Sequence, residues 1–233
     1  MIGFELGSRR ALCVRTERFG VPGRAAWRLL FASDLHLTAR REHLAAALLT
    51  AARATRPDRV LLGGDLVDAG SGVRLLATLV RDLAAIAPVR AVPGHHDAGV
   101  GLGTVRAALL AGGGSWFGDE ELRGAGRPSL AIATRLEPAA HRPARRLLLA
   151  HDPAVFPRAA AAGFDIVLAG HLHGCQCVLW RRRQRLYPGA FFYRWNGLRF
   201  AAGPSAMVVS RGVADTLPLR YRCPREVILV EVA

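Results

Sequence analysis

The chain contains no lysine, so all of its 32 basic side chains are arginine. Acidic residues are also few, and 18 Asp and Glu leave a formal net charge of +14. Such an excess of positive charge attracts anionic partners, whether phosphate esters, nucleic acids or acidic membrane lipids. Only four cysteines occur in 233 residues, which argues against a disulfide scaffold and fits a reducing compartment.

Long apolar runs are lacking as well. No run approaches the roughly 18 to 20 residues that cross a bilayer, so the sequence predicts no transmembrane helix. Charged side chains interrupt Met1–Gly20, which leaves no apolar core for a signal peptide. We therefore expect a cytoplasmic protein. Its length suits a single domain, 1–233, that can bury a sizeable core.

Asp and His residues gather in five short clusters, each of which follows an apolar run. Of the eight histidines, only His43 and His141 lie outside these clusters. The clusters are Ser33–His36, Gly63–Asp65, Gly94–Asp97, Ala150–Asp152 and Gly170–His173. One such cluster alone is commonly a turn or a core histidine, but five at equivalent positions indicate a shared function.

The apolar runs before the clusters are short and rich in Val, Leu and Ile, as in buried strands. They are Trp27–Ala32, Arg59–Leu62, Val89–Val92, Arg146–Ala150 and Ile166–Ala169. Ligands of open α/β sheets bind beyond the carboxyl ends of strands, so the clusters are predicted to converge there. Carboxylate and imidazole groups brought together in this way suit a two-metal hydrolytic centre.

Helices are expected between these strands. The amphipathic pattern predicts them at Arg41–Arg53, Val73–Ala85 and Thr104–Ala111. Further strands at Ala206–Ser210 and Glu226–Val230 would complete a second sheet. The predicted fold is thus α/β, a two-sheet β-sandwich flanked by helices.

The order of the motifs resembles that of the calcineurin-like metallophosphoesterases. The motifs are Asp34-Leu35-His36, Gly64-Asp65, Gly94-His95-His96-Asp97, His151 and Gly170-His171-Leu172-His173. The tail, with Ser210-Arg211-Gly212 and Leu217-Pro218-Leu219-Arg220, is similar to a bacterial branch of simple phosphodiesterases. This resemblance implies a four-layer, metallo-dependent phosphatase-like fold.

The resemblance also implies a binuclear metal centre. Asp34, His36 and His173 would hold one ion. His151 and His171 would hold the other, and Asp65 would bridge the two. A pair of cations roughly 3.5 to 4 Å apart clamps a phosphate and lowers the pKa of a shared water, which supplies the attacking hydroxide. The expected cofactors are two divalent or trivalent ions of Mn, Zn, Fe or Co.

One position departs from the family pattern, because His95 stands where the motif usually has Asn. His95 either ligates the second metal directly, points outward and leaves its place to water, or marks a crippled site. Direct ligation is the interpretation we favour, and its imidazole would tilt the site toward Zn, Fe or Co and away from Mg.

Two residues of the same motif are candidates for the chemistry itself. His96 matches the family histidine near the leaving group, where it would donate a proton or stabilise the departing oxygen. Asp97 would orient His96 by accepting its second N–H. The alternative for Asp97 is a carboxylate that caps a helix or loop.

The densest basic segment, Arg181–Arg185, begins shortly after His173 and is followed by aromatic residues from Phe191 to Trp195. It is expected to form a hairpin or flap beside the site. Its arginines would grip phosphates, while its aromatic residues would stack on bases or enter a lipid interface. The alternative is a solvated hairpin whose aromatic side packs on the core.

Two further segments are expected to carry no chemistry. Gly118–Pro143 is interpreted as a short excursion between elements. Cys175 and Cys177 are interpreted as half-buried residues of an extended strand, whose alternating side chains cannot easily share an ion.

The sequence therefore predicts a metallophosphoesterase that cleaves a phosphodiester or pyrophosphate bond of an anionic substrate. Within the branch, the alternatives are a pyrophosphate hydrolase acting on a UDP-diacylglucosamine-type precursor of lipid A, and a nuclease. The precursor would place the protein at the inner face of an anionic membrane. A catalytically idle module that binds a partner through its arginine-rich surface is the non-enzymatic alternative. The oligomeric state is left open.

Overall fold

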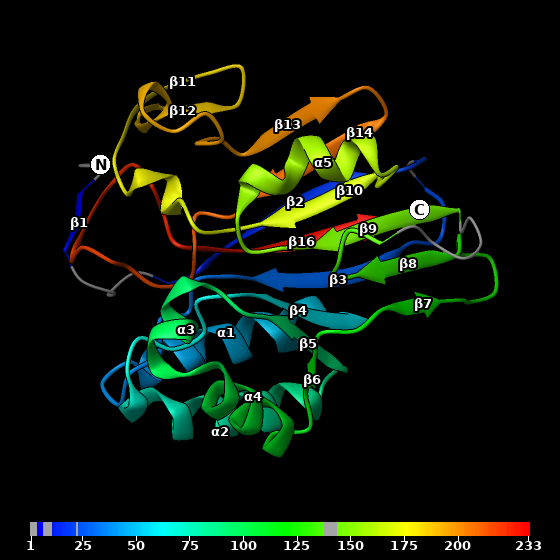
Figure 1. Cartoon of the computed structure of the whole chain (residues 1–233). Helices are drawn as coiled ribbons and strands as arrows, with labels where there is room; N and C mark the ends of the chain where they lie inside the picture. Colours follow the sequence, from blue (N-terminus) through cyan, green and yellow to red (C-terminus); the bar gives the residue numbers. More distant parts are fainter. Residues whose placement is uncertain (1–3, 7–10, 22, 138–143) are drawn as a thin grey trace.

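The computed structural model describes residues 4–6, 11–21, 23–137 and 144–233 (Figure 1). Two six-stranded sheets pack face to face in it, with strand orders β2-β16-β3-β4-β5-β6 and β13-β14-β10-β9-β8-β7. The first sheet comprises β2 (Cys13–Phe19), β3 (Trp27–Ala32), β4 (Arg59–Gly63), β5 (Val89–Val92), β6 (Ser115–Trp116) and β16 (Glu226–Val232). The second comprises β7 (Glu120–Leu122), β8 (Leu130–Ala133), β9 (Arg145–Leu149), β10 (Ile166–Ala169), β13 (Arg199–Ala202) and β14 (Ser205–Val209).

Two small sheets lie outside the sandwich. They pair β1 (Phe4–Leu6) with β15 (Leu219–Tyr221), and β11 (Val178–Arg182) with β12 (Arg185–Pro188). The helices are α1 (Glu42–Thr55), α2 (Val73–Ala84), α3 (His95–Val100), α4 (Leu102–Ala111) and α5 (Phe156–Ala161). Short 3₁₀ turns are η1 (Gly70–Gly72), η2 (Pro153–Val155), η3 (His173–Cys175) and η4 (Gly189–Phe191).

The sandwich has four layers. Helices α1, α2 and α4 cover the outer face of the first sheet, and α5 covers the outer face of the second (Figure 1). Strand β3 shows why both faces must be apolar. Leu29 and Phe31 enter the core between the sheets, whereas Leu30 and Ala32 enter the core beneath the helices. Successive side chains of a strand point to opposite faces, so a strand covered on both sides is apolar throughout. The predicted fold class is confirmed.

Parallel pairing brings the site-forming loops to one edge. Strands β3, β4, β5 and β6 are mutually parallel in the first sheet, and β8, β9, β10 and β14 are parallel in the second. Their carboxyl ends therefore lie at the same end of the sandwich. The five strands and three helices expected before the tail are all present, within a few residues of their predicted bounds. Of the two tail strands expected in the second sheet, only β14 lies there; β16 pairs with β2 and β3 of the first sheet, so that expectation is wrong for Glu226–Val230.

Two expectations for connecting segments are wrong. Residues 118–143 do not form an excursion, because β7 and β8 extend the second sheet at its edge; residues 138–143 lie outside the described part of the chain. Cys175 does not belong to a strand. It ends η3, both Cys175 and Gln176 have positive φ, and Cys177 makes only an isolated bridge to Tyr221.

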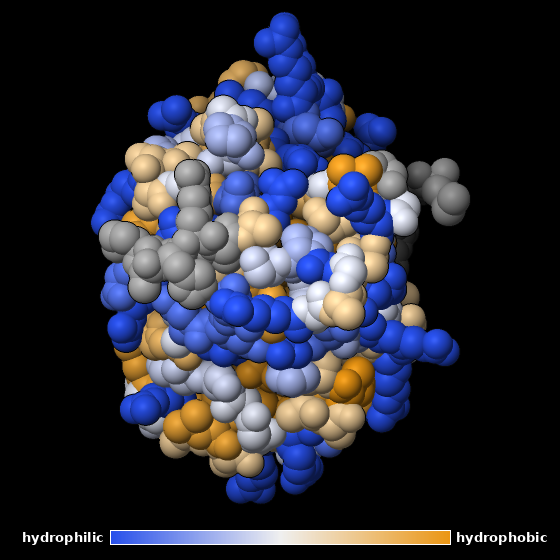
Figure 2. All heavy atoms as spheres, turned by 90° about the vertical axis from the view of Figure 1, so that its right-hand side faces the viewer, coloured by the Kyte–Doolittle hydropathy of each residue, from blue (hydrophilic) through white to orange (hydrophobic). Residues whose placement is uncertain are grey.

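No helix among the described residues is long and apolar enough to span a bilayer. Figure 2 shows the face that lies on the right of Figure 1, and hydrophilic residues dominate it, with hydrophobic ones scattered between them.

Candidate metal centre

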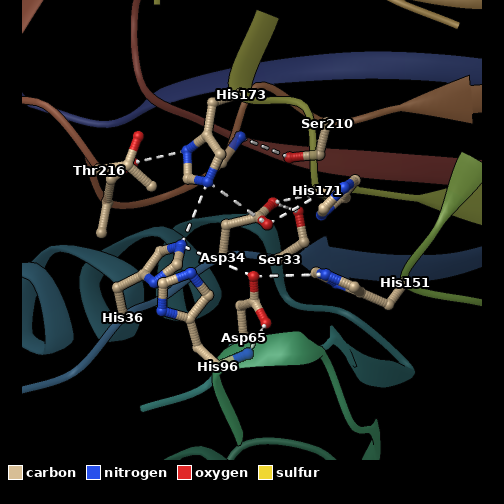
Figure 3. A network of polar contacts seen from close by, with 12 residues as sticks. Ser33, Asp34, His36, Asp65, His96, His151, His171, His173, Ser210 and Thr216 are labelled. Carbon is tan, nitrogen blue, oxygen red and sulfur yellow. Dashed lines mark hydrogen bonds and ion pairs between the residues drawn. The ribbon is translucent and has the colours of Figure 1, made fainter. Parts of the chain in front are cut away.

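The five Asp and His clusters meet at the carboxyl ends of strands from both sheets (Figure 3). Asp34 follows β3 and Asp65 follows β4, while His95 and His96 open α3 after β5. His151 follows β9, and His171 and His173 follow β10. The predicted convergence is confirmed.

Most of these residues have a backbone conformation that side chains rarely adopt. Positive φ angles occur at Asp34 (56°), His36 (43°), Asp65 (51°), His171 (73°) and His173 (50°). Each such residue costs about 1 to 3 kcal/mol and persists only where the surroundings hold it. Here the loops after β3 and β4 hold each other, since the Asp34 N–H donates to the Gly64 carbonyl at 2.9 Å and the His36 N–H to the Asp65 carbonyl at 2.8 Å.

The first cluster consists of Asp34, His36 and His173, whose ligand atoms all lie within 4.8 Å of one another. Nε2 of His36 is 3.1 Å from Nε2 of His173, which is 3.6 Å from Oδ1 of Asp34. All three residues are buried. Burial lowers the pKa of His173 to about 4, so its imidazole is neutral at neutral pH. A neutral imidazole is the form that binds metals.

The second cluster consists of His95, His151 and His171, again with ligand atoms within 4.8 Å. The His95 ring centroid lies 4.7 Å from that of His171 and 5.2 Å from that of His151. Nδ1 of His151 is 2.9 Å from the Gly63 carbonyl, and this contact directs Nε2 toward the cluster. Nδ1 of His171 is buried without a hydrogen-bond partner among the described residues, and Nε2 of His151, also buried, faces only the Asp65 carboxylate, 3.3 Å away.

Asp65 lies between the two clusters (Figure 3). Its Oδ2 is 3.9 Å from Nε2 of His36 and 3.3 Å from Nε2 of His151, while Oδ1 accepts the His96 N–H at 2.9 Å. Burial alone would raise the pKa of this carboxyl, but His151 and the His96 N–H hold it well below its usual range. Asp65 in turn raises the pKa of His151 to about 9 against the effect of burial.

Gly94 permits the approach of Asp65 to α3. A Cβ at this position would lie 2.1 Å from Oδ1 and 2.3 Å from the backbone nitrogen of Asp65, which no side chain tolerates. Any other residue would displace the carboxylate that the two clusters share.

These buried nitrogens and oxygens suit bound metal ions. Orphaned buried polar atoms are rare in folded proteins and call for a partner. Imidazole nitrogens with one carboxylate oxygen are the donors that Zn, Fe, Co and Mn accept, and neither cluster has the all-oxygen set typical of Mg. The residues present therefore fit the cofactor that the sequence implies.

Asp68 connects the first cluster to His96, and the sequence did not reveal it. Its Oδ1 is 2.6 Å from Nδ1 of His36 and 2.8 Å from Nδ1 of His96, and Arg41 donates to Oδ2 at 3.3 Å. One carboxylate thus fixes the orientation of a candidate ligand and of the candidate acid. The only local signal is its place three residues after Asp65; its partner ring lies in another loop.

Asp97 does not contact His96 through its carboxylate in the described structure, so the predicted orienting role is corrected. Its Oδ1 accepts the Leu66 and Val67 N–H groups at 2.9 and 3.0 Å, and Oδ2 accepts the Gly94 N–H at 2.8 Å. The carboxylate is fully buried. Asp97 therefore caps α3 and holds the loop after β4 against it, which was the alternative interpretation.

A cavity of about 370 Å³ opens onto the clusters. The side chain of His96 is 46 % exposed at this cavity.

Gln176, a residue that the sequence did not single out, lines the cavity and holds the neighbouring segment 216–219 by hydrogen bonds. Its Oε1 accepts the Thr216 and Leu217 N–H groups, each at 3.0 Å, and its Nε2 donates to the Leu217 and Leu219 carbonyls.

Residues 210–214 of the tail hydrogen-bond to the loops that carry the candidate ligands. The Ser210 N–H donates to the Ala169 carbonyl at 2.8 Å, and the Ala214 N–H donates to the Asp34 carbonyl at 2.9 Å. The Ala214 carbonyl lies 3.2 Å from Nδ1 of His173. This segment therefore ties the ends of β10 and β3 together and orients one candidate ligand.

The fold and the paired donor clusters define a metal-dependent phosphoester hydrolase. The family model described as calcineurin-like phosphoesterase matches residues 28–175, and the chain belongs to that family. It is thus a metallophosphoesterase, for which divalent metal cofactors and a phosphate-ester substrate follow.

Individual known proteins are similar to most of the chain at low sequence identity. Phosphodiesterase YaeI of Escherichia coli (strain K12) is 29 % identical, over 89 % of this chain and 83 % of its own length. The structure of TT1561 of Thermus thermophilus matches with a TM-score of 0.51 and 17 % identity, over 81 % of this chain and 91 % of that one. A dimetal phosphatase from Danio rerio matches with a TM-score of 0.54 and 13 % identity, over 82 % of this chain and 89 % of that one.

Proposed function

We propose that the chain is a dinuclear phosphohydrolase that cleaves a phosphodiester or pyrophosphate bond. The main support is the position of Asp65 between the clusters. Its Oδ2 lies 3.9 Å from Nε2 of His36 in the first cluster and 3.3 Å from Nε2 of His151 in the second. A shared carboxylate is what a pair of adjacent cations requires. The name of the E. coli relative, a phosphodiesterase, supports a diester as a substrate.

The two ions would be held by residues that the strands already bring together. Asp34, His36 and His173 would bind one ion. His95, His151 and His171 would bind the other, with Asp65 between them. When bound, the pair supplies positive charge that grips phosphate oxygens and makes water acidic enough to attack phosphorus near neutral pH. The chain keeps His173 neutral and Asp65 ionised, so both are ready to ligate.

His96 would act as the acid. Its Nδ1 lies 2.8 Å from Asp68, so the proton available for transfer is on Nε2, and its partly exposed ring is at the cavity. From there Nε2 would donate its proton to the departing oxygen. A positioned acid contributes a factor of about 10² to 10⁴ in rate.

His95 would ligate the second ion directly. Its position within 4.8 Å of the ligand atoms of His151 and His171 supports this. An imidazole here favours Zn, Fe or Co over Mg. In protein loaded with Co, His95→Asn should replace one nitrogen scatterer by oxygen in X-ray absorption. An unchanged spectrum, or a metal-loaded structure with the His95 ring more than about 3 Å from any ion, would reject the assignment.

The reaction is tested with a chromogenic bis-aryl phosphate and protein loaded with Mn, Zn, Fe or Co. Asp65→Asn should lose both bound metal and turnover. His96→Ala should retain its metal and lose rate, most for poor leaving groups. Equal metal loss in the two variants would show that their roles are misassigned, and no turnover with any of the four metals would refute the proposed activity.

A further inference from the structure

Most of the exposed large hydrophobic side chains among the described residues lie in one stretch of the chain, 179–219. They are Leu179, Trp180, Phe191, Phe192, Tyr193, Leu217 and Leu219. Phe191 is 67 % exposed and Phe192 is 79 % exposed. Contiguous exposed apolar groups on a soluble fold usually mark a binding surface. We call Phe191, Phe192 and Tyr193 the aromatic knob.

The aromatic knob is held outward by folded structure. Nη2 of Arg185 donates to the Ala190 carbonyl at 3.2 Å and to the Arg194 carbonyl at 3.0 Å. The N–H groups of Phe192 and Tyr193 both donate to the Gly189 carbonyl. Phe191 packs on Tyr187 and Trp180 of the β11–β12 hairpin, with ring centroids 5.0 and 6.0 Å apart. The knob and the hairpin thus form one unit, and the exposure of the rings is built into it.

The surroundings of the knob are strongly positive. No Asp or Glu occurs from 166 to 214, whereas seven arginines do. Arg181, Arg182 and Arg183 are exposed at the tip of the hairpin and have no carboxylate partner among the residues that the structure describes. In Figure 1 this hairpin lies at the same end of the sandwich as α3, which carries His95 and His96.

The apolar surface also borders the metal centre. Tyr193 and Leu217 line the same cavity as Asp65, His96 and His173. A partner bound to the knob therefore reaches the mouth of the candidate active site.

We propose that the aromatic knob and the β11–β12 hairpin dock on an anionic lipid bilayer. Aromatic rings enter the interface between headgroups and acyl chains, while the arginines at the tip contact lipid phosphates. A single-stranded nucleic acid would use the rings for stacking. The exposed aliphatic side chains of Leu179, Leu217 and Leu219 offer no face to stack on, and they favour lipid.

Docking in this orientation brings the cavity to the level of the headgroups. Substrates with a phosphate ester or pyrophosphate at that level would then reach the centre without leaving the membrane. This consequence rests on the proposed function, whereas the docking itself does not.

The test is sedimentation with vesicles of phosphatidylcholine alone and of phosphatidylcholine with about 30 % phosphatidylglycerol. Wild-type protein should bind the anionic vesicles and release them as salt rises. Phe191→Ser with Phe192→Ser should weaken binding at least about tenfold. Arg181→Gln, Arg182→Gln and Arg183→Gln together should do the same.

The matched control replaces Arg53, Arg74 and Arg106 by Gln. These are exposed residues of α1, α2 and α4, and the net charge changes equally. Binding by this control should stay within about twofold of wild type, since its charges lie away from the hairpin. Hydrolysis of a soluble bis-aryl phosphate should be unchanged in every variant, which separates a failure of docking from a failure of the proposed activity.

Thermal unfolding of each variant checks that it is folded. Phe192→Trp should retain vesicle binding, because Trp also prefers the membrane interface. Three results would overturn the proposal. The first is equal sedimentation of wild type and the Phe191, Phe192 variant with anionic vesicles. The second is a control variant that loses as much binding as the hairpin variant. The third is a wild type that binds a single-stranded oligonucleotide and no vesicle, which would assign the surface to nucleic acid instead.

Discussion

Asp68 offers the sharpest test of how the centre is organised. Its Oδ1 is hydrogen-bonded to Nδ1 of His36 at 2.6 Å and lies 2.8 Å from Nδ1 of His96. A hydrogen bond to a charged group contributes about 1.5 to 3 kcal/mol, or roughly a factor of 10 to 100. Asp68→Ala should therefore weaken metal binding through His36 by about 10- to 100-fold, the range found for supporting carboxylates of metal sites.

The same substitution should slow turnover through His96 by a further factor of about 10 to 100. At saturating metal only this second loss remains, so Asp68→Ala with His96→Ala should then be no slower than His96→Ala alone. Asp68→Asn keeps an oxygen in place without the charge, and it should fall between wild type and Asp68→Ala.

The assays are calorimetric titration with Zn or Mn and turnover of a bis-aryl phosphate at saturating metal. Metal affinity equal to wild type in Asp68→Ala would refute the role at His36. Fully additive rate losses in the double variant would refute the role at His96.

Two further predictions concern the support of the centre. Gly94→Ala should displace Asp65, because its Cβ would lie 2.1 Å from Oδ1; metal content measured by elemental analysis should fall while the fold, followed by circular dichroism, persists. At Glu226, burial alone would raise the pKa of the carboxyl, but Arg15 and Arg211 hold it below its usual value. The stability it contributes is present above the unfolded pKa of about 4.3 and is lost as pH falls through the folded pKa. Glu226→Gln should lose about 3 to 5 kcal/mol in urea unfolding at pH 7, and this deficit should shrink below pH 4; a deficit independent of pH would contradict the ion pairing.

The parts of the fold that were predictable are those with a strong local pattern. Strand β10 is an uninterrupted apolar run and β3 is apolar from Leu29 to Ala32, because both of their faces are covered. The ligands stand directly after these runs, so sheet topology alone brings them together. The hairpin was also expected, from the place of the basic segment shortly after His173, and β11 and β12 form it.

The parts that were not predictable depend on contacts between distant residues. Asp68 acts through His96, which lies in another loop, and no spacing rule connects them. Asp97 directly follows His96 in the sequence, which suggested that its carboxylate orients that ring. In the structure the carboxylate instead accepts three backbone N–H groups from two loops. Gln176 follows the last metal motif without any local signal, and its role appears only when 216–219 folds back over it.

Asp65 is proposed to bridge two ions, and electron paramagnetic resonance of the Mn-loaded protein detects such a bridge. Two ions roughly 3.5 to 4 Å apart that share a carboxylate are exchange-coupled, so a multiline coupled spectrum with two Mn per chain is expected. Asp65→Asn should lose that spectrum. A six-line signal of isolated Mn in the wild type, with one ion per chain, would contradict the bridging role of Asp65.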